Sequence, residues 1–270
     1  MMWSIRVFVR RLRLELVSAL GAVLLVSAAG LVLTWEMSQA RGTASEFDWL
    51  QWLPYLQVAL VCLPVVAGLA FAASLIAGEI DSGTSVFAWS VVRSRRRWLA
   101  DLVFAGLLAL VVITVPLVLV SLTLSGSLGP ILDAASAPAS IDTAAVLIPA
   151  RAIAAFAVGT LVALIVGRSL QALAAGLIAV CLVLGAVELG FAAWRQAAAG
   201  PIDLTQPGAF PVAQQASANP VVVPESPTVG NGLSPDARLL LLLGQTGTLV
   251  VTAAGAVLIT SLIVERRRPV

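Results

Sequence analysis

The residues best suited to chemistry in this sequence gather in one segment, residues 78–98, between two long apolar runs. This charged segment opens with two carboxylates and closes with a cluster of arginines. Charges at this density are costly in hydrocarbon, which places the segment outside the membrane core. Its carboxylates and guanidinium groups are suited to binding a soluble protein partner. The candidate residues are Glu79, Asp81, Gly83, Thr84, Trp89, Arg93, Arg95, Arg96 and Arg97.

Catalytic chemistry has little support in this sequence. It contains no histidine and no lysine, and all 16 basic residues are arginine. Histidine is the commonest general base and metal ligand, and a phosphate-binding loop of the G-x-x-x-x-G-K-[ST] type requires lysine. We therefore predict no catalytic residue, no metal site and no ATP hydrolysis by such a loop. Cys62 and Cys181 fall within apolar runs, far apart, and are predicted to be small buried hydrophobic residues.

The elements that position the charged segment are apolar runs long enough to cross a membrane. Hydrophobic residues make up 60% of the chain and charged residues 11%, whereas soluble domains carry about 25% charged residues. The mean hydropathy is +1.01. Because the apolar runs are continuous, they do not fit a transmembrane β-barrel, whose segments alternate. The predicted fold is an all-α polytopic membrane protein in a single transmembrane domain, residues 1–270.

Six runs reach the length of about 20 residues that a membrane-spanning helix needs. The first is longer than the apolar core of about 7–15 residues in a signal peptide, which favours a retained span. The six predicted spans cover residues 15–35, 54–77, 99–124, 144–166, 170–193 and 239–264.

The arginines predict the orientation of these spans. Twelve of the 16 lie before span one, between spans two and three, between spans four and five, or after span six. Only Arg41, Arg195 and Arg238 lie on the other side, and Arg151 lies within span four. Arginine and lysine are enriched in cytoplasmic segments. We therefore expect both termini in the cytoplasm, in agreement with an even number of spans.

Two further segments outside the spans have distinct patterns. Residues 1–13 place apolar and arginine side chains on opposite faces of a helix, which fits either an amphipathic interfacial helix or a simple basic tail. Residues 194–238 contain seven prolines, a density that excludes a regular helix. This long outer loop could fold back as a gate or remain mobile, and the sequence leaves both open.

Two charges fall inside predicted spans. Arg151 and Glu188 lie in the outer parts of spans four and five. Intramembrane charges are costly and often functional, so the two residues could pair with each other or line a substrate path. Both are also close enough to the outer interface to reach it with their long side chains.

The charge order within the charged segment predicts a helix along the membrane surface. Glu79 and Asp81 come early, where a helix N-terminus favours negative charge. Gly83 and Thr84 offer a flexible or capping position, and the arginines follow, facing lipid phosphates or solvent. A rigid element joined to two spans can transmit force from a bound partner.

The segment resembles the first cytoplasmic loop of ATP-binding-cassette (ABC) type-2 permeases, the membrane subunits of one class of exporters. In that family a carboxylate, Gly-Thr, a helix and an arginine-rich turn follow span two. The string GTSVFAWSVVRSRRRWL, residues 83–99, is especially similar to the actinobacterial branch. This chain departs from the family in two places: Asp101 stands where a basic residue is common, and Val91-Val92 where proline is common.

The resemblance implies a mechanism and partners. A separate ABC ATP-binding subunit, carrying ATP and Mg²⁺, would dock under the coupling helix within residues 78–98, and two permease chains would form a homo- or heterodimer in the lipid of a bacterial plasma membrane. Cargo would be a drug, peptide or lipid-like compound. No nucleic acid is implied. The alternative is a non-transport scaffold or assembly protein that binds a cytosolic partner through the same segment; a membrane-embedded hydrolase ranks third, because its catalytic side chains are missing.

Overall fold

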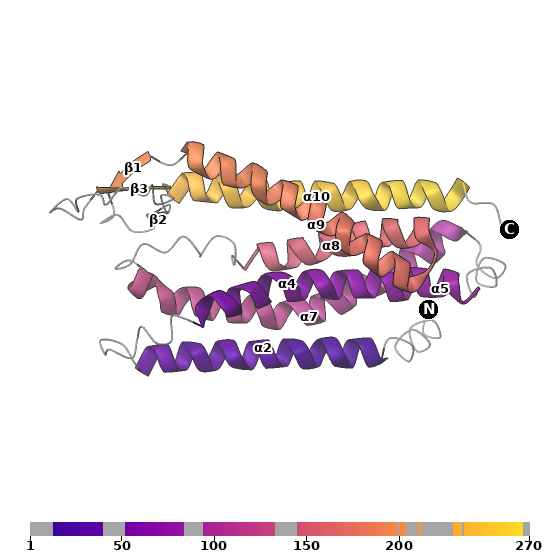
Figure 1. Cartoon of the computed structure of the whole chain (residues 1–270), viewed down its shortest axis with the longest axis horizontal. Coiled ribbons are helices and arrows are strands. Elements are labelled where there is room, and N and C mark those ends of the chain that lie inside the picture. The colour runs from indigo at the N-terminus through magenta and orange to yellow at the C-terminus, as the bar shows by residue number, and fades with distance from the viewer. Residues whose placement is uncertain are drawn as a thin grey trace.

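The computed structural model describes residues 13–39, 52–83, 94–132, 145–198, 200–203, 210–211, 229–233 and 235–266. Figure 1 shows a bundle of long helices that run side by side along the long axis, with the first and last described residues, 13 and 266, at the same end. Six helices of the described part are long and apolar enough to cross a membrane. This confirms the predicted all-α architecture of six spans. The predicted amphipathic helix, residues 1–13, lies almost entirely outside the described residues.

Each long helix grows from one apolar run of the sequence, and all except Leu147–Val166 lie in a helical segment that continues past both ends of the run. The apolar side chains favour burial in the membrane and the main chain must satisfy its own hydrogen bonds there, so the run becomes helical. The helices are α2 (Arg13–Gln39), α4 (Leu53–Ala72), α7 (Arg95–Leu132), α8 (Leu147–Val166), α9 (Ser169–Ala198) and α10 (Pro235–Arg266).

The second span contains a π-helical turn that the sequence pattern does not predict. Helix α4 passes into the π-helix η1 (Ala73–Ala77) and then into a last α-helical turn, α5 (Gly78–Asp81). Four of the five η1 residues are buried. Single π turns inside α-helices are rare and frequently lie at functional sites. Here the π turn immediately precedes the charged segment.

The helices alternate in direction, so their ends form two groups. Helices α2, α7 and α9 begin at one end of the bundle, and α5, α8 and α10 finish there. We call it the arginine-rich end, because the described part of the chain places Arg13, Arg95–Arg97, Arg168 and Arg266 there. The other is the opposite end.

Helix α8 lies at the centre of the packing. It contacts α4, α7, α9 and α10, while α2 packs on α7 and α4 at one side of the bundle. Helices α4 and α8 approach closely through their main chains, because a Cβ added at Gly68 would lie 2.6 Å from the carbonyl oxygen of Ala152. Small residues permit such close helix packing in membranes. The largest fully buried side chains include Phe71, Phe156, Leu60, Ile76, Leu110 and Ile113.

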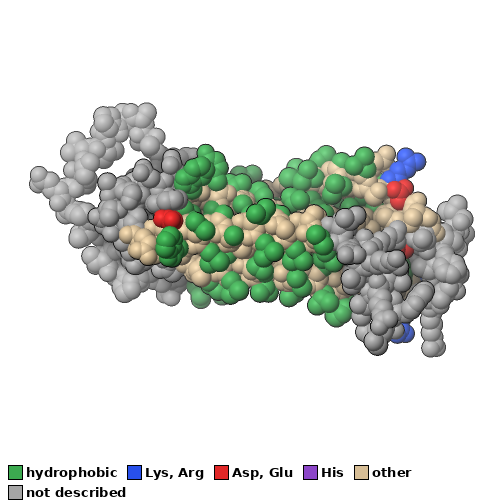
Figure 2. All heavy atoms as spheres, turned by 90° about the horizontal axis from the view of Figure 1, so that it is seen from below, with side chains coloured by type: hydrophobic (Ala, Val, Ile, Leu, Met, Phe, Trp, Pro, Cys, Tyr) green, Lys and Arg blue, Asp and Glu red, His purple; other side chains and the backbone are tan. Residues whose placement is uncertain are grey.

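The surface of the bundle is apolar along its length. In Figure 2 hydrophobic side chains cover the middle of the visible face, and the coloured charged side chains lie toward the two ends. This pattern fits a protein surrounded by lipid. Cys62 on α4 and Cys181 on α9 are exposed, so the prediction that both are buried is wrong. Inside a membrane, an apolar residue gains as much by facing lipid as by facing the core.

A small antiparallel sheet lies within the predicted outer loop, residues 194–238. Strand β3 (Val229–Leu233) pairs on one side with β1 (Gly200–Asp203) and on the other with β2 (Phe210–Pro211). The two prolines of the sheet, Pro201 and Pro211, lie on the edge strands, where a missing N–H is tolerated. The loop is shorter than predicted, because α9 continues to Ala198 and α10 begins at Pro235.

Candidate functional site

The described parts of the charged segment lie at the arginine-rich end of the bundle. Residues 78–83 finish the second span and residues 94–98 open the third. Thr84, Trp89 and Arg93, which were predicted to take part in partner binding, lie outside the described residues. The site is therefore described from its two flanks.

The carboxylates of the segment belong to a different element from the one predicted. Glu79 and Asp81 lie in α5, the last turn of the second span, instead of opening a new helix. The prediction that they occupy a helix N-terminus is wrong, because the π turn carries the helix through Gly78. Their own helix does not favour negative charge at its C-terminal end, so another partner must stabilise them.

Asp81 finds such a partner at the start of α9. Its Oδ2 atom accepts a hydrogen bond from the hydroxyl of Ser169 at 3.0 Å and one from the Ser169 main-chain N–H at 3.4 Å. The first N–H groups of a helix have no partner within the helix, and the N-terminus favours a negative charge. Asp81 therefore serves as a cap for α9 from 88 residues away in sequence.

The arginine cluster forms the first turn of α7. Ser94 precedes it and caps the helix, accepting hydrogen bonds from the Arg97 N–H at its main-chain oxygen (3.1 Å) and its hydroxyl oxygen (3.3 Å). Trp98 and Leu99 are buried and anchor this turn to the core. Positive charges at a helix N-terminus oppose the helix dipole by about 0.3–1 kcal/mol each. The cluster thus lies where it weakens its own helix, which indicates a role other than helix stability.

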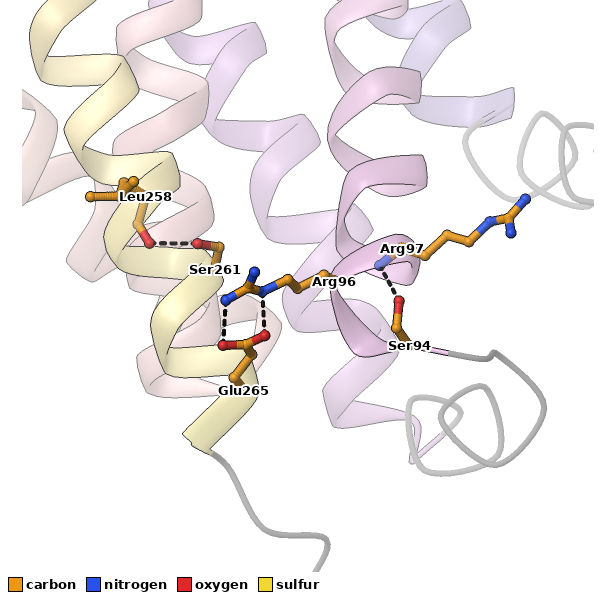
Figure 3. A network of polar contacts seen from close by, with 6 residues as sticks. All are labelled: Ser94, Arg96, Arg97, Leu258, Ser261 and Glu265. Atoms are coloured by element: carbon orange, nitrogen blue, oxygen red, sulfur yellow. Dashed lines mark hydrogen bonds and ion pairs between the residues drawn. The ribbon is translucent and has the colours of Figure 1, made fainter.

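One arginine of the cluster binds the last helix. Arg96 forms a two-pronged ion pair with Glu265 of α10, through its Nε and Nη2 atoms (Figure 3). A paired fork of this kind fixes the relative orientation of the two side chains. The Arg97 side chain extends away from α10 in the same view and is exposed.

Two glycines end the helices that meet at this site. Gly83 follows α5 with φ +70°, and Gly167 follows α8 with φ +71°. Left-handed residues of this kind close helices by bonding back to their last carbonyls; the Gly167 N–H donates to the Ala163 oxygen at 2.9 Å. A Cβ at Gly167 would also lie 3.2 Å from Ile80 of α5, whereas one at Gly83 meets open space.

This difference gives a matched pair of variants. Gly83→Ala and Gly167→Ala both force alanine into the left-handed region, which costs about 1–2 kcal/mol. Gly167→Ala adds the contact with Ile80, so it is expected to lower the melting temperature more. Thermal unfolding in detergent, followed by tryptophan fluorescence, measures both. Equal melting temperatures of the two variants would show that α5 does not pack on the α8–α9 turn.

A second group of polar residues lies inside the bundle near the opposite end. Arg151 is only 3% exposed, and its Nη2 atom forms an ion pair with Glu188 Oε1 at 2.5 Å. Gln245 Nε2 donates to the same oxygen at 2.9 Å. Since Arg151 is four residues from the start of α8, the group lies about 6 Å inside that end of the helix. This polar network joins α8, α9 and α10, with the Arg151 side chain buried between the helices.

Comparison with known families decides between the possible classes of membrane protein. The model of the family described as "ABC-2 membrane transporter related" matches residues 50–191, just over half of the chain. The chain belongs to this family. No curated protein and no solved structure matches it. This ABC-2 family member is thus a multi-pass membrane protein and an ABC transporter permease, a membrane transport component.

The matched region of the ABC-2 permease covers the second span, the charged segment, α7, α8 and most of α9. It includes Asp81, Ser169, Arg151 and Glu188, but it excludes α2 and α10. The contacts of Arg96 with Glu265, and of Glu188 with Gln245, therefore join the matched region to a helix outside it.

Sequence reasoning missed three residues of these two sites in the permease. Gly167 is a glycine between two apolar runs, a signal that one helix ends there and the next begins. Ser169 comes two residues later, so this signal could have identified it as a residue at the start of a helix. Glu265 directly follows predicted span six and precedes three arginines. Gln245 is a lone amide in an apolar run. In each case the sequence signals a polar residue but does not name its partner.

Proposed function

We propose that the chain is the membrane subunit of an exporter driven by ATP hydrolysis on a separate nucleotide-binding subunit. That subunit docks on the charged segment, residues 78–98, and carries the ATP and Mg²⁺. Two membrane subunits, identical or different, form the transport path. Closure of the nucleotide-binding subunits moves the charged segments and switches access between the two sides of the membrane.

The observation that carries this proposal is the arginine cluster at the start of α7. It opposes the dipole of its own helix, it lies in the same matched stretch of sequence as two carboxylates, Glu79 and Asp81, and Arg97 is exposed. A cluster in this place is suited to an acidic surface on a soluble partner, since complementary charge guides and orients protein association.

The remaining parts of the proposal follow from sequence and composition. The arginine-rich end faces the cytoplasm of a bacterium by the positive-inside rule. The Ala-Trp and Arg-Arg-Arg-Trp-Leu spacing supports the actinobacterial branch of the family. The apolar bundle interior is compatible with an amphipathic drug, peptide or lipid-like cargo.

Reversal of one exposed arginine tests the docking surface. Arg97→Glu is expected to weaken binding of the ATP-binding subunit about tenfold, which corresponds to about 1.4 kcal/mol. The change favours the α7 dipole, so lost binding cannot be attributed to a weakened helix. The measurement is affinity purification of the tagged chain from mild detergent, with quantitative mass spectrometry of the co-purified subunit.

Arg266→Glu is the matched control. Arg266 is also an exposed arginine at the arginine-rich end, and its reversal changes the net charge by the same amount. We expect this variant to retain the subunit. Equal loss in both variants would indicate general electrostatic attraction, and a preparation without any ATP-binding subunit would contradict the proposed function itself.

A further inference from the structure

We propose that Ser169 and Glu265 are positioning residues that tie the two flanks of the charged segment to α9 and α10, so that these two helices receive its movement. The inference rests on the proposed function, since it names the helices on which the ATP-binding subunit acts. Neither residue belongs to the predicted docking surface. Each acts through a charged residue of the segment.

The first tie joins the N-terminal flank to α9. Asp81 accepts two hydrogen bonds from Ser169, from its hydroxyl and its main-chain N–H. The carboxylate lies at the positive end of the α9 dipole, which strengthens the contact. Ile80 packs beside it at the α8–α9 turn, where Gly167 leaves room. A displacement of α5 is therefore delivered to the first turn of α9.

The second tie joins the C-terminal flank to α10. Arg96 and Glu265 meet through two parallel contacts (Figure 3), and the fork holds the last turn of α10 in register with the first turn of α7. Glu265 opposes the dipole of its own helix end. The pair therefore aligns two helices without favouring either one alone.

Fold stability does not account for the second tie. The side chains of Arg96 and Glu265 are 58% and 45% exposed, and ion pairs with this exposure contribute little to stability. A two-pronged ion pair still fixes the relative orientation of its two side chains when its contribution to the free energy of folding is small. The first tie is likewise exposed at Asp81.

Both ties lead to helices that meet again near the opposite end. Glu188 of α9 and Gln245 of α10 bind each other there, and Glu188 also binds Arg151 of the central helix α8. Helices are rigid over this length, so α9 and α10 move as levers held at one end by the charged segment. The polar network is the point where their movement reaches α8.

Distances between spin labels near the opposite end test the proposal. The labels replace Tyr55 on α4 and either Leu189 on α9 or Leu239 on α10, all exposed positions, in a Cys62→Ala/Cys181→Ala background. Pulsed electron paramagnetic resonance compares the complex with its ATP-binding subunit without nucleotide and trapped with ATP, Mg²⁺ and vanadate. We expect a nucleotide-dependent shift in both label pairs of the otherwise unchanged protein.

The variants separate the two ties. Ser169→Ala is expected to lose the shift at Leu189 and keep it at Leu239, and Glu265→Gln is expected to do the reverse. Ser169→Thr keeps a hydroxyl and Glu265→Asp keeps a carboxylate, so each should restore the lost shift. The matched controls are Ser261→Ala, whose hydroxyl donates to the Leu258 main-chain oxygen within α10, and Arg266→Gln, beside Glu265. Both variants should keep both shifts.

Several results would overturn the inference. The first is that both shifts persist in Ser169→Ala and in Glu265→Gln. The second is that either variant loses both shifts, because the proposal requires each variant to affect one helix. The third is that the unchanged complex shows no nucleotide-dependent shift. Failure of the proposed function is seen earlier and separately, as the absence of a co-purified ATP-binding subunit.

Discussion

Replacing Glu188 by alanine is expected to lower the free energy of unfolding by about 3 kcal/mol, the lower end of the range for breaking a buried ion pair. The loss of stability comes from Arg151, the partner that stays in the variant. Arg151 is 3% exposed, so the variant leaves a guanidinium group buried without its carboxylate. The lower end applies because the Glu188 side chain is 33% exposed, so the bundle encloses the pair only in part.

A double substitution provides the decisive comparison. Arg151→Met/Glu188→Leu removes both charges and fills the space with apolar atoms, so it should recover most of the stability lost in Glu188→Ala. Unfolding in mixed detergent micelles, followed by tryptophan fluorescence, measures all three proteins. Asp101→Asn, at an exposed carboxylate of α7, is the control and should be neutral. A double variant no more stable than Glu188→Ala would show that the pair is not the source of the loss.

Gly68→Val is expected to be the most damaging change of a single small residue in the bundle, at or above about 3 kcal/mol, the upper end for overpacking a core. A Cβ at this position would lie 2.6 Å from the Ala152 oxygen and 3.1 Å from the Phe156 nitrogen. Both are main-chain atoms, so no side-chain rotation can relieve the contact. Helix α4 would have to move away from α8, which also carries the polar network.

The matched control is Gly21→Ala on α2. A Cβ there meets nothing within 4 Å, and alanine favours a helix by up to about 1 kcal/mol over glycine. Gly21→Ala should therefore be neutral or stabilising, and Gly68→Ala should fall between it and Gly68→Val. The order of the three midpoints in a detergent unfolding series is the measurement. A Gly68→Val protein as stable as Gly21→Ala would contradict the observed α4–α8 approach.

The spans were predictable because their cause is local. A run of about 20 apolar residues in hydrocarbon must form a helix, so residues 99–124 and 239–264 reappear inside α7 and α10. The π turn at residues 73–77 was not predictable, since its apolar side chains fit an α-helix equally well. The small sheet was hidden because its strands have two to five residues and no alternating pattern.

The candidate site was predictable in its residues and not in its contacts. Charge alone places Asp81 and the arginine cluster outside the hydrocarbon, on one side of the membrane. Their partners, Ser169 and Glu265, come from helices 88 and 169 residues away, and such pairing depends on how the helices pack. For Arg151 and Glu188, pairing was one of the alternatives that the sequence left open, and the packing of α8 against α9 selects it.

The π turn before the charged segment sets the direction in which the residues of α5 face. A turn that bonds residues five apart holds one residue more than an α-helical turn, and each residue of an α-helix advances by about 100° around the axis. Without η1, Ile80 and Asp81 would lie about a quarter-turn around α5 from their present place. The extra residue held by η1 thus determines whether Ile80 and Asp81 face the α8–α9 turn.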